Sequence, residues 1–572
     1  MTHANIIADA STETPGIIAG ELAAEEEELM GQNANYGSLQ DNNSNNNHND
    51  NQIDDFGGFA LPEAQLKVVL ASLFMAAYLA ALDTTVVTTL LTLIASDLNA
   101  VGNISWIATA YLLSSAALQP IFGKLSDIFG RRILLLICTL LFAIGCLICA
   151  TDSLLWLVIG RFITGCGGSG MTCLGTITMS DLIPLRQRGY YQGLANVCFG
   201  LGSASGGIVG GLIADYFGWK WVFIFQVPLA FLCFLGLYFF LNLPAGSPGN
   251  GSPGHVTEKL KRVDFLGSFC LVTFLMSLLT AASLGGKDVA YTSKTFIGLC
   301  IISAAFLFAF IYVESSVSEE PIIPMHLLKV RTIIASSLTN WFYTMAIFTV
   351  LFYIPIYYTS VMDLTATQNG LRLVPNFFAA SAGSVGAGIY MRRTGKYYKA
   401  TAIIGLFAML GSVAILNLTP QIPTWAQFVI LLPGGFGYSW MLTVTLLALI
   451  AAVPSKFQAC TTSVQYTFRS TGSTLGVSIA SAIFQHVLRS SLNQKVKAII
   501  TDPHKAAKII KHALANTDYT KTAPKLVQPA IRESYALGCK GAFAFSLATI
   551  TLGYICSLFM KEHKLHTSVN RD

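Results

Sequence analysis

The chain has 572 residues, of which 53% are hydrophobic and only 11% carry a charge, whereas roughly 25% of residues are charged in a typical soluble domain. This composition excludes an ordinary soluble protein. The formal net charge is +5, yet twelve of the thirty acidic residues precede Lys67, so the rest of the chain is strongly basic. An excess of Lys and Arg is typical of loops at a membrane surface. We therefore predict an all-α integral membrane protein.

Residues 1–65 form a segment rich in Glu, Asn and Asp, with a low-complexity run from Asn42 to Asn51. Such a segment has too little apolar surface to offset the entropy of ordering, so we predict a disordered cytosolic tail. Within it, Glu25, Leu29 and Met30 resemble an acidic dileucine sorting signal, which would bind a sorting adaptor. A charged disordered run explains the same residues equally well.

Beyond the tail, mainly apolar runs of about 17 to 25 residues recur to the end of the chain. A helix of this length spans about 30 Å of hydrocarbon. We count fourteen predicted spans, at 68–91, 104–122, 133–150, 154–176, 190–213, 221–241, 264–284, 295–313, 334–358, 370–390, 399–417, 426–452, 464–487 and 540–560.

The distribution of Lys and Arg predicts the orientation. With a cytosolic N-terminus, the basic residues fall mostly in loops on the cytosolic side, which is the positive-inside pattern. The predicted segments are an N-terminal six-helix half (66–243), a cytosolic loop (244–263), an inserted helix pair (264–313), a second cytosolic loop (314–333), a C-terminal six-helix half (334–560) and a cytosolic tail (561–572). A long luminal loop (488–539) precedes the last span, and it could form a short amphipathic helix.

The turn between the second and third spans carries the sharpest motif, Gly-Lys-Leu-Ser-Asp-Ile-Phe-Gly-Arg-Arg at 123–132. Its glycines permit a tight turn and close helix approach, and Asp127 can cap a helix or pair with Arg131. Such a pair would latch one conformation. A similar spacing of Gly388, Gly395 and Lys396 follows the second span of the other half, which suggests a parallel repeat of six spans. The alternative is that these glycine and arginine residues only mark a short loop on the cytosolic side, without a latch role. The predicted latch residues are Gly123, Asp127, Gly130, Arg131 and Arg132.

Asp83 in the first span and Arg161 in the fourth interrupt apolar helices at comparable depth. An acid at membrane depth costs about 2.5–3.5 kcal/mol on insertion scales, so it usually faces a cavity and marks an ion or proton path. Arg161 is the predicted partner of Asp83. The alternative is that Asp83 only anchors helix packing or ends its span near water. Arg469 lies near the start of the thirteenth span, where we expect its long side chain to reach the membrane surface.

A run of glycines marks the fifth span, where small residues at four-residue spacing let helices approach closely. Packing explains this run fully. The predicted helix-packing residues are Gly202, Gly206, Gly207, Gly210 and Gly211.

These motifs together resemble the major facilitator superfamily. The 123–132 turn is similar to its signature loop, residues 82–87 (Leu-Asp-Thr-Thr-Val-Val) resemble the motif of its fourteen-span drug:proton antiporter branch, and Arg161 to Gly168 look like the arginine motif of proton-coupled members. The fifth span departs from the antiporter motif, because Gly207 stands where proline is usual. The resemblance covers roughly residues 66–560 and implies two six-helix halves with a central inserted pair. Residues 180–193 and 219–228 look most like fungal vacuolar basic amino acid transporters.

The resemblance implies a proton-coupled antiporter that moves Lys, Arg or His into the vacuole, with protons, small cationic substrates and the bilayer as partners. We expect no enzyme, because the chain lacks G-x-S-x-G, H-E-x-x-H and P-loop patterns, and we expect no cofactor, metal or nucleic acid. Two alternatives stay open: a plasma-membrane exporter of drugs or toxic compounds, and a nutrient-sensing membrane receptor.

Overall fold

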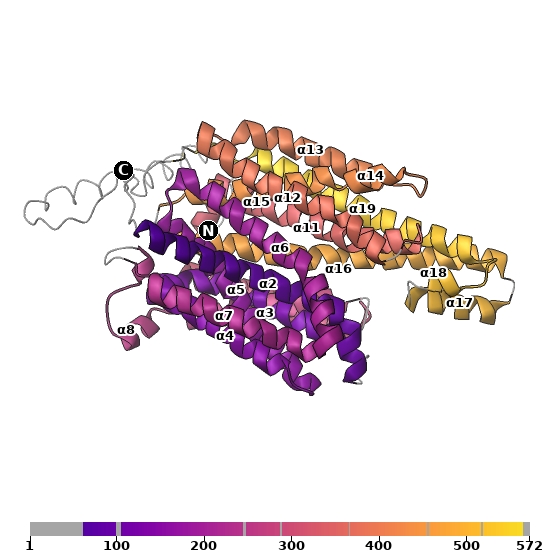
Figure 1. The fold of residues 1–572 in the computed structure, drawn as a ribbon, viewed down its shortest axis with the longest axis horizontal. Helices are drawn as coiled ribbons and strands as arrows, with labels where there is room; N and C mark the ends of the chain where they lie inside the picture. Colours follow the sequence, from indigo (N-terminus) through magenta and orange to yellow (C-terminus); the bar gives the residue numbers. More distant parts are fainter. Residues whose placement is uncertain are drawn as a thin grey trace, which may run out of the picture.

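The computed structural model describes residues 61–98, 104–243, 248–285, 289–364, 366–454, 457–500, 502–515, 519–563 and 565. All of its regular elements in these ranges are helices, and they lie side by side in one elongated bundle (Figure 1). The first group of six packs as one half of the bundle: α2 Glu63–Asp97, α3 Ile104–Phe129, α4 Arg131–Cys149, α5 Leu154–Leu182, α6 Leu185–Phe217 and α7 Trp219–Phe240.

The second half of the bundle is built from the C-terminal helices and lies beside the first (Figure 1). Its members are α11 Arg331–Ser360, α12 Ala366–Thr394, α13 Tyr398–Leu416, α14 Thr424–Val429, α15 Leu432–Ala451, α16 Gln458–Ile499 and α19 Gln528–Leu558. Each half has its own apolar core. Leu79, Phe142 and Phe223 belong to the N-terminal core, whereas Tyr353 and Phe543 belong to the C-terminal one.

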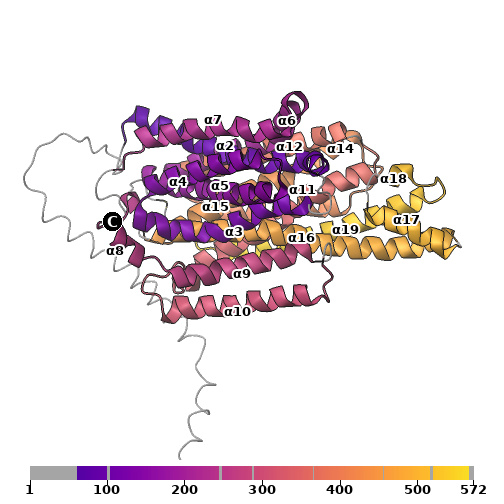
Figure 2. The same ribbon diagram turned by 90° about the horizontal axis from the view of Figure 1, so that it is seen from below.

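Two further long helices, α9 Phe265–Leu284 and α10 Lys294–Ser316, lie along one edge of the bundle beside α3 and α16 (Figure 2). Their contact with the N-terminal half includes Ala117 of α3, which packs against Leu271 and Leu275 of α9. Short helices occupy the loops before and after this pair: η2 Pro248–Asn250, α8 Val256–Lys261 and η3 Leu327–Lys329.

Each of the fourteen predicted apolar runs coincides with one of the long helices, the twelfth with α14 and α15 together. Eleven helical segments in the described ranges are long and apolar enough to cross a membrane. The other long helices on predicted runs are α3, α12 and α16. The all-helical fold class is therefore confirmed, and the full count of fourteen spans stays a prediction.

Most of the segment predicted as a luminal loop, 488–539, is helical instead. α16 continues to Ile499, α17 covers Pro503–Ala515, α18 covers Tyr519–Thr522, and α19 already begins at Gln528. These extensions form the end of the bundle that projects beyond the other helices (Figure 1). Leu492 of α16, Ile510 of α17 and Ile531 of α19 share one buried core. The short amphipathic helix suggested for this loop corresponds to α17, whereas the extension of α16 and the early start of α19 were not predicted, because charged residues on their outer faces hide the apolar stripe in a hydropathy profile.

Two ends of the bundle matter for the site. The latch end is the end where α3 turns into α4 at Gly130. The opposite, far end carries α17 and α18 (Figure 1). The positive-inside pattern predicts that the latch end faces the cytosol.

Candidate functional site

Asp83 and Arg161 form a buried ion pair inside the N-terminal half. Asp83 lies on α2 and Arg161 on α5, and Nη1 of Arg161 is 2.7 Å from Oδ2 of Asp83. Their relative exposures are 0% and 1%. The structure thus brings together the two residues that the sequence predicted as partners. Because both charges are out of water, removing either would leave the other uncompensated.

The surroundings of this pair restrain the arginine more than the carboxylate. The guanidinium of Arg161 lies 4.6 Å from the centre of the Tyr111 ring, and its Nε donates to the carbonyl oxygen of Ile107 at 3.4 Å. The hydroxyl of Tyr111 in turn donates to the carbonyl oxygen of Ala80 at 3.3 Å. Oδ1 of Asp83, in contrast, has no hydrogen-bond partner among the described residues. This oxygen is therefore a buried acceptor that no described donor satisfies, whereas the other oxygen makes a charge-assisted bond to Arg161.

The predicted latch is assembled around Arg131, whose side chain is 2% exposed. Its Nη1 lies 2.6 Å from Oδ1 of Asp127, and its Nε donates to Oδ2 of Asp181 at 3.0 Å. Nη1 also donates to the hydroxyl of Ser126 at 2.6 Å. The pairing of Asp127 with Arg131 was expected. The contact with Asp181 of α5 was not expected, although Asp181 follows the fourth predicted span and therefore lies in a loop predicted on the cytosolic side, like Arg131.

The glycines and the second arginine of the latch have different neighbours. Gly130 has a φ of 96° and caps α4, a backbone conformation that side chains rarely adopt. A Cβ atom at Gly123 would lie 2.6 Å from the carbonyl oxygen of Ala459 on α16, so only glycine lets α3 touch the other half here. Arg132 binds within its own half, donating to Oδ1 of Asn242 at 2.7 Å.

The loop after α10 attaches the inserted pair to the latch. Glu320 lies 2.9 Å from Nζ of Lys124 and 2.6 Å from Nε of Arg262. The hydrogen bond from Arg262 is the main cause that lowers the pKa of Glu320 below its ordinary value. Two residues further on, the carbonyl oxygen of Ile322 accepts from the thiol of Cys460 on α16, across 2.9 Å. This loop therefore touches both halves at the latch end.

Close backbone contacts and hydrogen bonds hold the two halves together at the latch end. A Cβ atom at Gly388 of α12 would lie 2.4 Å from the carbonyl oxygen of Gly189 on α6. Nε of Arg186 donates to the carbonyl oxygen of Arg392 at 2.8 Å. The structure is therefore a conformation closed at the latch end.

Three of the five predicted packing glycines lie directly against another helix. Gly202, Gly206 and Gly210 are buried against α2, where a Cβ at Gly202 would lie 2.3 Å from the carbonyl oxygen of Tyr78. The prediction is wrong for Gly211, because no atom of another described segment lies within 4 Å of its Cβ position. Gly207 is only partly buried. Successive helix residues are rotated by about 100°, so Gly207 and Gly211 lie on a different face from the i, i+4 stripe.

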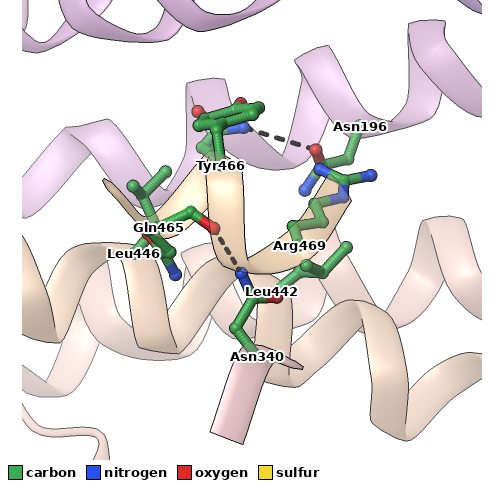
Figure 3. A pocket seen from close by; sticks show the side chains of 8 residues that line it. Asn196, Asn340, Leu442, Leu446, Gln465, Tyr466 and Arg469 are labelled. Atoms are coloured by element: carbon green, nitrogen blue, oxygen red, sulfur yellow. Dashed lines mark hydrogen bonds between the residues drawn. The ribbon is translucent and has the colours of Figure 1, made fainter. Parts of the chain in front are cut away.

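A small polar cavity lies between the two halves, and the sequence did not predict which residues line it. Figure 3 shows its lining side chains, with Gln465, Tyr466 and Arg469 coming from one helix, α16. The complete lining is Gln192, Asn196, Asn340, Leu442, Leu446, Gln465, Tyr466 and Arg469. Polar side chains at four-residue spacing, Gln192 with Asn196 on α6 and Gln465 with Arg469 on α16, indicate in the sequence only that each of these helices has a polar face.

Arg469 corrects a prediction. It lies eleven residues into α16, which begins at Gln458, and so roughly 16 Å along the helix axis at 1.5 Å per residue. At this depth its side chain lines the cavity instead of reaching the membrane surface. The apolar run predicted for this span begins at 464, about six residues after the start of α16. This late start places Arg469 near the membrane surface in the prediction.

The remaining sequence predictions fall outside the site. Glu25, Leu29 and Met30 lie outside the described residues. In the described ranges, no group of three or more His, Cys, Asp or Glu side chains could hold a metal ion.

A helical bundle with two halves, an ion pair at membrane depth and a polar cavity between the halves defines a membrane transporter and not an enzyme. The chain belongs to the major facilitator superfamily, whose family model matches residues 73–477. It is similar over 87% of its length to the vacuolar membrane amino acid uptake transporter fnx2 of Schizosaccharomyces pombe, at 35% identity and with 84% of that protein covered. The multidrug resistance protein fnx1 of the same organism is 34% identical over 88% of this chain and 94% of its own.

Solved structures support the fold. The proton:xylose symporter XylE, bound to 6-bromo-6-deoxy-D-glucose, matches with a TM-score of 0.56 at 15% identity, over 88% of this chain and 98% of its own. The human organic anion transporter MFSD10 matches with a TM-score of 0.54 at 14% identity, over 86% of this chain and 99% of its own. At such low identity these structures support the architecture alone.

Proposed function

We propose that this chain is a proton-coupled secondary transporter of the vacuolar membrane that moves basic amino acids, namely Lys, Arg and His, into the vacuole by antiport. The buried pair of Asp83 and Arg161 carries the proposal, because an ionisable pair inside a membrane-spanning bundle usually marks a proton or ion path. The likeness to a protein named as a vacuolar membrane amino acid uptake transporter supports the substrate class and the compartment.

Asp83 would couple the proton to the conformational change. A proton entering from the acidic lumen neutralises the carboxylate of Asp83 and weakens its bond to Arg161, so α2 and α5 are less tightly held. Release of the proton to the cytosol restores the ion pair. The contacts around Arg131 would act as the latch that holds the cytosolic side closed during part of this cycle.

All fourteen long helices would cross the membrane in this proposal, as in the fourteen-span antiporter branch. α16 is then a span despite its polar cavity-lining residues, because those side chains face protein and not lipid. The inserted helices α9 and α10 add two spans at the edge without breaking the two six-helix halves.

The test is uptake of labelled lysine, arginine and histidine into vacuolar vesicles that contain the chain, with and without a proton uncoupler. We expect uptake that the uncoupler abolishes, and we expect Asp83→Asn to lose it. Asp152→Asn is the control, since Asp152 is an exposed acid paired with Lys220 outside the cavity and the buried pair. Full proton-dependent uptake by the Asp83→Asn variant would show that this carboxylate has no coupling role.

A second candidate function is export of drugs or other toxic organic compounds across the plasma membrane. The likeness to the multidrug resistance protein fnx1 at 34% identity favours it. Localising a tagged chain separates the two proposals, because an exporter would be at the cell surface. Growth of a deletion strain on cationic drugs would then test export directly.

A further inference from the structure

The polar cavity between the halves contains a guanidinium that pairs with no described acid. Arg469 makes contact with two aromatic rings, Phe199 at 5.5 Å and Tyr466 at 5.9 Å from the guanidinium carbon to the ring centres. Phe199 belongs to the N-terminal half and Tyr466 to α16 of the C-terminal half. The two rings contact the face of the guanidinium, and they accept no hydrogen bond from the five N–H groups that lie in its plane. Its planar donor fork therefore remains available to a bidentate acceptor.

The same cavity contains two buried acceptors without donors. Oε1 of Gln192 and Oε1 of Gln465 have no hydrogen-bond partner among the described residues, and both side chains are 3% exposed. Their amide nitrogens are already engaged. Nε2 of Gln192 donates to Oδ1 of Asn196 at 3.3 Å, and Nε2 of Gln465 donates to Oγ1 of Thr445 at 2.9 Å. These hydrogen bonds determine the orientation of each amide group. The atoms without a partner are therefore the two oxygens, which need an N–H donor.

The free space is about 10 Å³, which holds about one water molecule. The site is thus collapsed in this conformation, with donors and acceptors drawn together while the latch end is closed. A ligand larger than water would enter when the halves separate. The apolar side chains Leu442 and Leu446 on α15 offer the adjoining wall.

We propose that this cavity binds the zwitterionic main-chain end of an amino acid, with the ligand's carboxylate on Arg469 and its α-ammonium group on the oxygens of Gln192 and Gln465. A guanidinium fork matches a carboxylate in geometry and charge, and amide oxygens accept from an ammonium group. A cation that lacks a carboxylate would be repelled by the positive charge of Arg469, so its binding would be weaker. This inference rests on the proposed function, and it distinguishes amino acids from cationic drugs at the same site.

The first test varies the ligand and leaves the protein unchanged. Binding to the purified full chain in lipid nanodiscs is measured for L-lysine, L-arginine and L-histidine, and for two lysine analogues. Cadaverine lacks the carboxylate, and 6-aminohexanoate lacks the α-ammonium group. We expect both analogues to bind at least about tenfold more weakly than lysine, as loss of one charge-assisted interaction implies. Equal binding of cadaverine and lysine would overturn the proposal while leaving amino acid transport intact. Absence of binding for lysine, arginine and histidine alike would contradict the proposed function and this inference together.

The second test varies the protein. Arg469→Gln should weaken lysine binding at least about tenfold and cadaverine binding little or not at all, so the ratio of the two affinities falls. Arg469→Lys keeps the charge without the fork and should recover part of that ratio. Arg489→Gln is the matched control, because Arg489 is an exposed arginine on the same helix α16. An unchanged ratio in Arg469→Gln would overturn the assignment, since a merely structural role would reduce both affinities alike.

Discussion

Nη1 of Arg161 lies 2.7 Å from Oδ2 of Asp83, and the bond joins α5 to α2 where both side chains are buried from solvent. The other oxygen of Asp83 has no partner among the described residues. The pair is thus balanced in charge but incomplete in hydrogen bonding. The second carboxylate oxygen is therefore a buried acceptor that no described donor satisfies.

The ion pair makes a prediction about stability that is separate from transport. Asp83→Ala leaves the buried Arg161 without its counter-charge, which should destabilise the fold by about 3–5 kcal/mol. Arg161→Ala should cost a similar amount, and the double variant should cost less than the sum of the two. Thermal unfolding in detergent measures all three. The exposed pair of Asp152 and Lys220 is the control, whose removal should cost at most about 1 kcal/mol. Additive losses at Asp83 and Arg161 would contradict a direct coupling.

The contact between Gly388 and Gly189 predicts which substitution opens the latch end. A Cβ atom in Gly388→Ala would lie 2.4 Å from the backbone of Gly189, so α6 and α12 must separate. Overpacking of this kind costs about 1–3 kcal/mol. We expect amide hydrogen exchange to quicken in the facing segments of both helices, at roughly tenfold per 1.4 kcal/mol.

The control for this substitution lies on the same helix. At Gly386 the nearest atom to a Cβ is a ring carbon of Trp440 at 3.7 Å, which is ordinary contact. Gly386→Ala should therefore leave exchange unchanged or slow it slightly, because alanine favours helix by up to about 1 kcal/mol. Equal exchange in the two variants would mean that this backbone contact does not hold the latch end closed.

How far the sequence predicted these features depends on whether the signal was local. Apolar length located the helices, and single charges within apolar runs identified Asp83 and Arg161, because each is exceptional in its own segment. The cavity could not be predicted this way. Gln192 and Gln465 belong to different halves, and the packing of α6 against α12 and α15, together with that of α16 against α3 and α5, brings them to one cavity. The prediction for Arg469 was wrong because the depth of this residue in the bundle depends on where α16 begins, and a hydropathy profile locates the start of a helix poorly.

Glu320 predicts a pH dependence at the latch end. Its pKa is lowered in the folded state by Arg262 and Lys124, so its contribution to stability is present above the ordinary glutamate pKa of about 4.3. That contribution is lost as the pH falls through the lower folded-state pKa. Because these side chains are about a third exposed, we expect at most about 1 kcal/mol. Wild type should unfold at a higher temperature than Glu320→Gln at pH 7, and the gap should close below about pH 4. A gap that persists unchanged in acid would show that the ion pairs are not its source.

The glycine stripe of α6 predicts opposite effects of one substitution at two positions of the same helix. Gly202→Ala places a Cβ 2.3 Å from the carbonyl oxygen of Tyr78, which α2 cannot relieve without moving, so we expect a loss of about 1–3 kcal/mol. Gly211→Ala meets no atom of the other described segments within 4 Å, and it should gain up to about 1 kcal/mol from helix propensity. The melting temperature should therefore fall in the first variant and stay level or rise in the second. A fall of similar size in both would mean that glycine serves α6 through backbone flexibility and not through its contact with α2.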